Sequence, residues 1–213
     1  ITELSEVEIQ DSTENSEKTA KLTFGVNEFS ILLALNEAAA GVAEVNGNAY
    51  DTLEEAFAAA GDGDTVKVLK NCGLSSAISV DKDLTLDLNE KTVTVKIAPE
   101  ERAAQTVNAF TVEAEKKLTV QNGKMFGTKG MNQRAIQANE KSVVSLNGVR
   151  FALFDSKTGN GGVVSMDKGT LEAESCEFGY ADKNATPTSG RNKAQKGGAI
   201  SAEDSILKIK NNR

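Results

Sequence analysis

Several residue types that carry chemistry are scarce or missing in this chain of 213 residues. It contains no His and no Trp, only two Cys and two Pro, and 5% aromatic residues. Because there is no His and no Cys-x-x-Cys motif, a metal site built on Cys72 and Cys176 is not expected. Apolar runs are also short, and none reaches the roughly 18 residues that a membrane-spanning helix needs. We therefore expect no membrane insertion within this chain.

Charge is distributed unevenly along the sequence. The net charge is −7, but residues 1–60 carry twelve acidic and two basic side chains, whereas residues 61–213 carry nineteen acidic and twenty-two basic ones. An acidic end on a nearly neutral body argues against nucleic-acid binding, which calls for a basic face. The first 60 residues are best interpreted as containing a solvated acidic segment.

A short phrase of alternating apolar residues recurs along the chain and is its main signal. In the clearest copy, residues 135–151, the pairs Ile136/Ala138 and Val144/Leu146 are separated by a charged turn. The other copies begin their two strands at Ile78 and Leu84, Phe110 and Leu118, Val164 and Leu171, and Ile200 and Leu207. The second strand always starts 6 to 8 residues after the first.

Alternation with a period of two indicates half-buried strands, and copies spaced 26 to 36 residues apart indicate stacked coils that share a core. Antiparallel hairpins would favour Asn-Gly between the two strands of a copy, but Asn147-Gly148 follows the second strand. The pattern thus predicts an all-β chain, a right-handed parallel β-helix from about Val66 onward, over an antiparallel sandwich. The expected buried columns contain Ile78, Val80, Phe110, Val112, Ile136, Val144, Leu146, Val164, Leu171, Ile200 and Ile209.

The repeats resemble those of the pectate-lyase-like superfamily of parallel β-helix proteins. The run Gly197-Gly198-Ala199-Ile200, followed by Leu207-Lys-Ile209-Lys-Asn211, is similar to a rung of adhesin-like bacterial surface proteins and autotransporter passengers. The resemblance covers residues 42–213. It implies a fold and a secreted or cell-surface location, but it is weak for activity, because lyases, hydrolases, adhesins and tailspikes share this scaffold.

The sequence predicts two parts. Residues 1–41 form an N-terminal extension or small cap unit, either an antiparallel unit with a polar turn at 11–18 or a helix over 28–40. Residues 42–213 form the β-helix, which we expect to be truncated at the C-terminus. A capping helix is expected at its start, begun by Asp51 or Thr52 and ended by Gly61. Its apolar face would consist of Leu53, Ala56, Phe57 and Ala60.

Catalytic carboxylates are not apparent. Glycan hydrolysis and lysis use clustered acids, but at the outward strand positions Asp87 and Glu174 are isolated and lie several coils apart. Asp62 and Asp64 have the oxygen ligands that calcium prefers, although a turn after the helix explains them equally. No metal or cofactor is expected. The two Cys, four coils apart, should not be joined to each other.

The variable connections 96–108, 127–134, 152–162 and 179–198 share one register, and they carry nine basic and four acidic side chains. Long loops on a rigid scaffold are common binding elements. The predicted binding residues are Lys183, Arg191, Lys193, Lys196, Lys129 and Arg134. The sequence therefore favours a non-catalytic, adhesin-like protein that binds a glycan or a host-surface ligand. Two alternatives stay open: a polysaccharide lyase or hydrolase whose catalytic coils lie outside this chain, and a purely structural rod.

Overall fold

The structure is a computed structural model that describes residues 10–14, 17–22, 31–35, 41–97, 105–179 and 190–213; the first three of these segments are described as strands only. The chain divides into two compact units, residues 1–40 and 41–213. Within the described residues, no helix has both the length and the apolar character needed to cross a membrane.

The first unit contains a three-stranded antiparallel sheet in the order β1-β2-β3. Its strands are β1 (Gln10–Glu14), β2 (Glu17–Leu22) and β3 (Ile31–Leu35). The alternative of a helix over 28–40 is wrong, because β3 occupies residues 31–35. The predicted turn at 11–18 is wrong, because β1 and β2 occupy most of it. None of the residues of β1 is apolar, so hydrophobic alternation could not reveal that strand.

The second unit begins with a hairpin of β4 (Ala43–Val45) and β5 (Asn48–Tyr50). Its two-residue loop, Asn46-Gly47, has positive φ at both positions, 51° and 81°, as a tight hairpin turn requires. On its other edge β4 pairs antiparallel with β6 (Thr65–Val68). The hairpin therefore forms one edge of the large sheet that contains β6 and β9.

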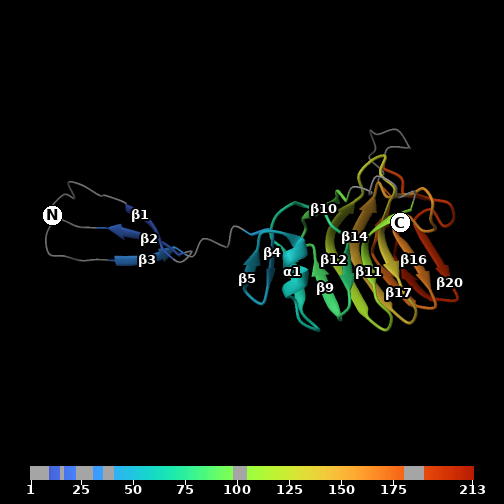
Figure 1. The fold of residues 1–213 in the computed structure, drawn as a ribbon, viewed down its shortest axis with the longest axis horizontal. Helices are drawn as coiled ribbons and strands as arrows, with labels where there is room; N and C mark the ends of the chain where they lie inside the picture. The colour runs from blue at the N-terminus through green and yellow to red at the C-terminus, as the bar shows by residue number, and fades with distance from the viewer. Residues whose placement is uncertain (1–9, 15–16, 23–30, 36–40, 98–104, 180–189) are drawn as a thin grey trace. The chain divides into compact units, whose positions relative to one another are not determined.

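The predicted capping helix is α1 (Leu53–Ala59), which lies beside these strands (Figure 1). The side chain of Thr52 accepts a hydrogen bond from the Glu55 amide at 3.1 Å, and this caps the helix N-terminus. Leu53 and Ala56 are buried, and the Phe57 ring lies 5.3 Å from that of Phe110. The apolar face predicted from the sequence is thus the face that joins the core.

The remaining described strands pair in parallel, and most of them are short (Figure 1). They are β7 (Cys72–Leu74), β8 (Ile78–Val80), β9 (Leu84–Asp87), β10 (Thr92–Val95), β11 (Val107–Val112), β12 (Lys117–Phe126), β13 (Gln133–Ala138), β14 (Val143–Ala152), β15 (Asp155–Ser156), β16 (Val164–Asp167), β17 (Thr170–Glu174), β18 (Glu177–Phe178), β19 (Lys193–Ala194), β20 (Ile200–Glu203) and β21 (Ile206–Lys210). The chain is therefore mostly β, with largely parallel sheets and one short helix in its described part.

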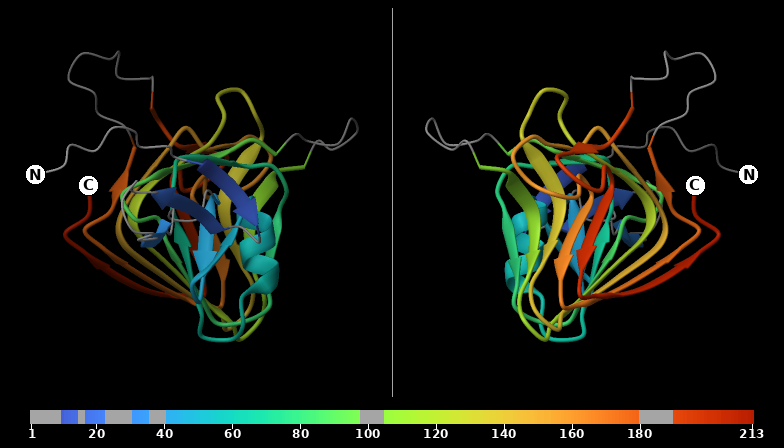
Figure 2. Two further views of the ribbon diagram at one scale, coloured as in Figure 1. Left: turned by 90° about the vertical axis from the view of Figure 1, so that its left-hand side faces the viewer. Right: turned by 90° about the vertical axis from the view of Figure 1, so that its right-hand side faces the viewer.

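Corresponding strands of the sequence phrase lie next to each other in two large sheets. One contains the order β20-β16-β13-β11-β8, and the other contains β21-β17-β14-β12-β9-β6. Their parallel pairing aligns the rows Ile78–Phe110–Ile136–Val164–Ile200 and Leu84–Leu118–Val144–Leu171–Leu207. The end views in Figure 2 look along these stacks of strands. The predicted register between phrases is confirmed.

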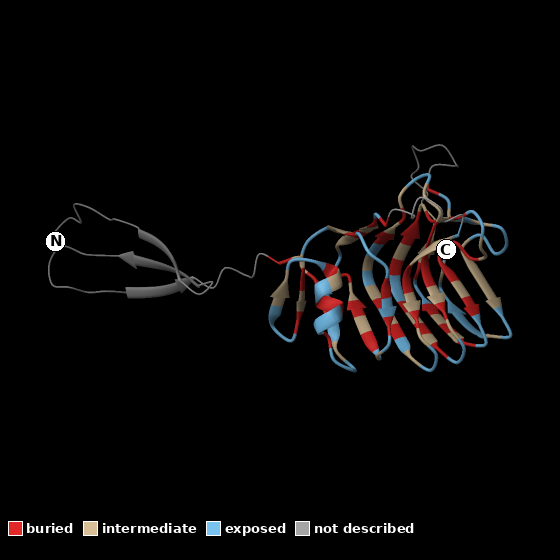
Figure 3. Ribbon diagram, viewed as in Figure 1, coloured by how far each residue is buried: buried red, intermediate tan, exposed pale blue. Residues whose placement is uncertain are grey.

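Burial follows the predicted columns in all but the last two strands (Figure 3). The expected core residues from Ile78 to Leu171 are all buried. The predictions for Ile200 and Ile209 are wrong: Ile200 is only partly buried, and Ile209 is 49% exposed. Both residues lie on the edge strands β20 and β21, so neighbouring strands cover them on one side only.

Candidate binding surfaces

Three connections come together at the ends of the strands opposite the tight turns, on one side of the second unit (Figure 1). They are residues 127–134, 152–162 and 190–198, and we call them the loop surface. β15 in the second connection pairs in parallel with β19 in the third, with Asp155 opposite Lys193. The connections are therefore in contact with one another, as their common register predicted.

Hydrogen bonds fix the backbone of the loop surface. The Asn132 Oδ1 atom accepts from the Lys157 amide at 2.8 Å and from the Thr106 hydroxyl at 3.0 Å. The Lys193 amide donates to the Phe154 carbonyl at 2.7 Å, and the Gln195 amide donates to the Gly159 carbonyl at 3.0 Å. Side chains on these segments consequently extend from a backbone that is held in place.

Four of the predicted binding residues are exposed on the loop surface: Lys129, Arg191, Lys193 and Lys196. Lys157, a basic loop residue that is not one of the predicted binding residues, is also exposed there. Lys183 lies outside the described residues. The structure thus gathers most of the predicted basic side chains on one hydrogen-bonded surface.

Arg134 is the exception, because it is 6% exposed and cannot present a charge to a large ligand. Its guanidinium donates to the carbonyls of Asn160 (2.6 Å) and Gly161 (2.9 Å), to the side-chain oxygens of Asn108 (3.0 Å) and Gln137 (2.6 Å), and to the Ser156 hydroxyl (3.3 Å). Every donor of the fork is used, and none of these partners is a carboxylate. Burial lowers the pKa of Arg134 to about 10, so the side chain stays charged at neutral pH. Arg134 therefore holds the loops together and does not present its charge on the loop surface.

Glycines in the following connection explain how Arg134 can be buried. A Cβ at Gly159 would lie 2.4 Å from Arg134 Nη2, so the guanidinium occupies the space that a side chain would fill there. Gly161, whose carbonyl accepts from Arg134, has φ +59°, and a Cβ there would lie 2.0 Å from the Val164 carbonyl oxygen, so a larger residue is not accommodated. The combination of an Arg in one phrase with the glycines at 159 and 161 before the next was a sequence signal for this burial.

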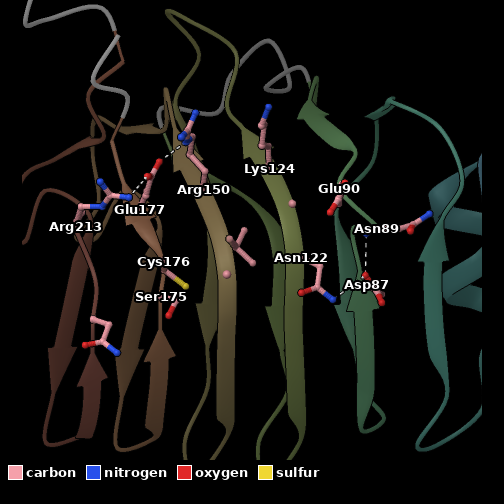
Figure 4. A pocket seen from close by; sticks show the side chains of 14 residues that line it. Asp87, Asn89, Glu90, Asn122, Lys124, Arg150, Ser175, Cys176, Glu177 and Arg213 are labelled. Atoms are coloured by element: carbon pink, nitrogen blue, oxygen red, sulfur yellow. Dashed lines mark hydrogen bonds and ion pairs between the residues drawn. The ribbon is translucent and has the colours of Figure 1, made fainter. Parts of the chain in front are cut away.

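A polar groove of about 880 Å³, not predicted from the sequence, is a second candidate surface (Figure 4). It follows the bend between the two arms of β12 and β14 and continues past the C-terminal ends of β9 and β17. The residues at the bend share a left-handed backbone conformation; they are Asn89, Asn122, Gly148, Ser175 and Asn211. The Asn positions that follow four of the five second strands were the available sequence signal.

Ion pairs connect charged side chains at one end of this groove. Glu177 accepts from Arg150 and forms a second ion pair with Arg213 at 3.1 Å (Figure 4). On the neighbouring face, the hydrogen bond and positive charge of Lys208 lower the pKa of Glu172. A general acid in glycan hydrolysis needs a raised pKa, so Glu172 has the opposite tuning. The Asp87 carboxylate accepts from the Asn89 amide at 2.8 Å and from the Gln121 amide group at 3.1 Å.

The acidic turn after α1 is occupied by protein groups. Asp64 accepts from the Gly61 amide at 2.7 Å and from Asn46 at 3.0 Å, and Asp62 accepts from the Asp83 amide at 2.9 Å. These contacts match the turn alternative for the two carboxylates. Within the part of the chain that the structure describes, no group of three or more metal-binding side chains is placed to hold a metal ion.

The two thiols are free, and both are poorly placed for reaction. Burial, and then the negative charge of Glu54, raise the pKa of Cys72 to about 11, and burial also raises the pKa of Cys176. At pH 8 about one Cys72 side chain in a thousand is therefore a thiolate. We expect iodoacetamide to modify Cys72 slowly and Cys176 more slowly still in the folded protein, and both rapidly in denaturant.

Mass spectrometry of alkylated, unreduced protein measures this pattern. Protein unfolded in denaturant is the reference for the intrinsic rate at which each thiol is alkylated. Rapid modification of Cys176 before unfolding, or a peptide pair linked through the two Cys, would contradict the described core.

Comparison of the chain with protein-family models, with curated proteins and with solved structures found no match. The resemblance to the pectate-lyase-like superfamily therefore stays a prediction. The structure itself establishes a mainly β protein with largely parallel sheets.

Proposed function

We propose that residues 42–213 form a right-handed parallel β-helix of a secreted or surface-attached bacterial protein, adhesin-like and without turnover. Its loop surface would bind an anionic glycan. The enzyme and rod alternatives make different predictions for this surface, and the assays below separate them.

The alternation of strands between the two large sheets supports the β-helix. Along the chain, β8 and β9, β11 and β12, and β13 and β14 each place the first strand in one sheet and the second in the other. Each following pair stacks in parallel on the one before it. This is the arrangement expected when every phrase of the sequence makes one coil.

The observation that carries the binding proposal is the set of exposed cations on the loop surface. Lys129, Lys157, Arg191, Lys193 and Lys196 are exposed, and they extend from a hydrogen-bonded backbone. Asp155 is the acidic side chain among the described residues of these connections, and it is partly buried. A cluster of like charge attracts an oppositely charged ligand even when the net charge of the whole protein is negative.

The test is a glycan array that includes sulfated and uronic-acid glycans, repeated with Arg191, Lys193 and Lys196 all changed to Ala. Because an exposed ionic contact contributes about 0.2–1 kcal/mol, we expect roughly tenfold weaker binding and a decrease with added salt. The matched control changes Lys117 and Lys168 to Ala. Both are exposed at the tight-turn ends of the strands, and the control should bind as the unmodified protein does.

Three results would overturn the proposal. Binding that ignores the three loop substitutions but is lost in Lys124→Ala would move the site to the groove. Release of reducing sugar or of unsaturated product from any bound glycan would show an enzyme. Absence of binding to every anionic glycan would leave the purely structural rod.

A further inference from the structure

The polar groove crosses the stacked strands instead of following one of them (Figure 4). Its lining begins at Asp87 on β9 and ends beyond β21, at Asn211 and Arg213. The strands β9, β12, β14, β17 and β21 follow one another in the sheet, which makes four strand spacings. At ~4.8 Å per spacing the groove is about 19 Å long. A ligand that fills it is therefore elongated and lies along the stack.

The groove is open at the bend because Gly148 has no side chain. Gly148 lines the groove with φ +62°, and a Cβ added there would meet no other atom within 4 Å. Asn122 and Ser175, at the equivalent positions of the neighbouring strands, have the same left-handed backbone. The bend therefore accepts residues other than glycine, and a long side chain at position 148 would fill part of the groove.

The charges of the lining balance. Three acidic and three basic residues line the groove: Asp87, Glu90, Glu177, Lys124, Arg150 and Arg213. Two of the basic residues, Arg150 and Arg213, form ion pairs with Glu177. Nucleic acids and other polyanions are bound by basic surfaces, because their affinity comes largely from neutralised charge. The groove thus favours an uncharged ligand, in contrast to the loop surface.

Peptide ligands do not match the groove either. A peptide that adds as a strand needs an unpaired strand edge, but β12 and β14 are paired on both sides. An amphipathic helix needs an apolar groove, and a proline-rich segment needs aromatic side chains. Among the described residues, no aromatic side chain lines this groove. What remains is an uncharged chain that is recognised through polar side chains.

Several exposed side chains in the groove have hydrogen-bonding capacity to offer such a chain. Within the described structure, the side chains of Glu90, Lys124, Ser175 and Asn211 make no hydrogen bond or ion pair with another residue. They supply an acceptor, a donor, and two groups that do both. The hydroxyl groups of a sugar also donate and accept. We propose that this groove binds an uncharged, linear oligosaccharide that lies across the strands.

The length of the groove sets the size of the ligand. A sugar residue in an extended chain advances by nearly one strand spacing, so about four residues fit. Because the contacts are exposed and no aromatic ring is present for stacking, we expect weak binding, with a Kd of roughly 1 mM. Added salt should not change this Kd, since the ligand carries no charge. The inference does not rest on the function proposed for the loop surface.

The experiment uses saturation-transfer NMR to titrate the full chain with cellohexaose, laminarihexaose and maltohexaose at low and high salt. We expect at least one of these uncharged probes to bind. Gly148→Gln should weaken that binding about tenfold or more, because the new side chain takes the place of a sugar residue. Gly47→Gln is the matched control, since Gly47 also has a positive φ (81°) and open space around it but lies in the β4–β5 hairpin. The control should bind as the unmodified protein does.

A second variant keeps the proposal testable if Gly148→Gln does not fold. Ser175→Ala and Asn211→Ala together remove two free polar groups without adding bulk, and they should weaken binding about fivefold. Circular dichroism and a denaturation midpoint show whether each variant is folded. Changing Arg191, Lys193 and Lys196 to Ala should leave the binding of the uncharged probes unchanged, so this groove and the loop surface can fail separately. Failure of all three probes to bind, binding that salt weakens, or binding that survives both groove variants would overturn the proposal.

Discussion

Changing Leu146 to Ala is expected to lower the free energy of unfolding by about 2–5 kcal/mol, as for other buried large-to-small substitutions. Leu146 is 2% exposed, with Val120 and Ala173 as its row neighbours on β12 and β17. Ile209→Ala is the matched control, because Ile209 belongs to the same row but is 49% exposed. The control should lower the free energy of unfolding by roughly 1 kcal/mol or less.

Urea denaturation followed by far-ultraviolet circular dichroism measures both changes. The slope of the free energy of unfolding against urea concentration should be the same in both variants and in the unmodified protein. Equal slopes would show that unfolding exposes a similar surface in all three proteins. Equal losses for Leu146→Ala and Ile209→Ala would mean that the row does not run from the core to an exposed edge, and the described register would then be wrong.

Arg134→Ala should have the second large effect, a loss of about 3 kcal/mol in the free energy of unfolding. Removing the guanidinium leaves the carbonyls of Asn160 and Gly161 and the side-chain oxygen of Asn108 without their charged donor, and each such buried group costs about 1–3 kcal/mol. Arg134→Lys should restore only part of this, because one ammonium cannot reproduce a planar fork with five donors. Lys129→Ala on the same surface should change stability by less than about 0.5 kcal/mol.

Thermal and urea denaturation give the change in the free energy of unfolding for each of the three variants. Limited proteolysis reports on the connections of the loop surface. We expect faster cleavage within residues 152–162 in Arg134→Ala than in Lys129→Ala. Full recovery of stability in Arg134→Lys would show that charge alone matters there, contrary to the geometry described.

The parallel register was predictable because the spacing of the phrase is a local property of the sequence. Apolar alternation marks each strand, and the interval of 6 to 8 residues assigns Ile136 and Val144 to successive strands. The structure places these two residues in different sheets, each in parallel register with its equivalents. The capping helix was predictable for a similar reason, since Thr52 and the apolar spacing after it are local signals.

Exposure was less predictable, because it depends on what lies on the neighbouring strand. Arg134 looks like any basic loop residue until Gly159 and Gly161 are placed beside it. Ile209 matches its buried equivalents in sequence, yet nothing in the phrase shows that β21 is an edge. The groove likewise arises from side chains such as Asp87 and Arg150, which are far apart in the chain. In each case the deciding contact crosses from one copy of the phrase to another.

The stacking of similar strands also bears on how the chain reaches its folded state during synthesis. Side-chain hydrogen bonds between neighbouring strands join residues 26, 27, 34 and 36 positions apart, so successive pairings close loops of similar length. The entropy lost in closing a loop grows only slowly with its length, and each step therefore has a similar cost. The β4–β5 hairpin and α1 are translated before the other strands of this unit, so they supply the first surface on which the next strand can pair. The second unit can thus be completed in the order in which the ribosome delivers it, without waiting for a distant segment.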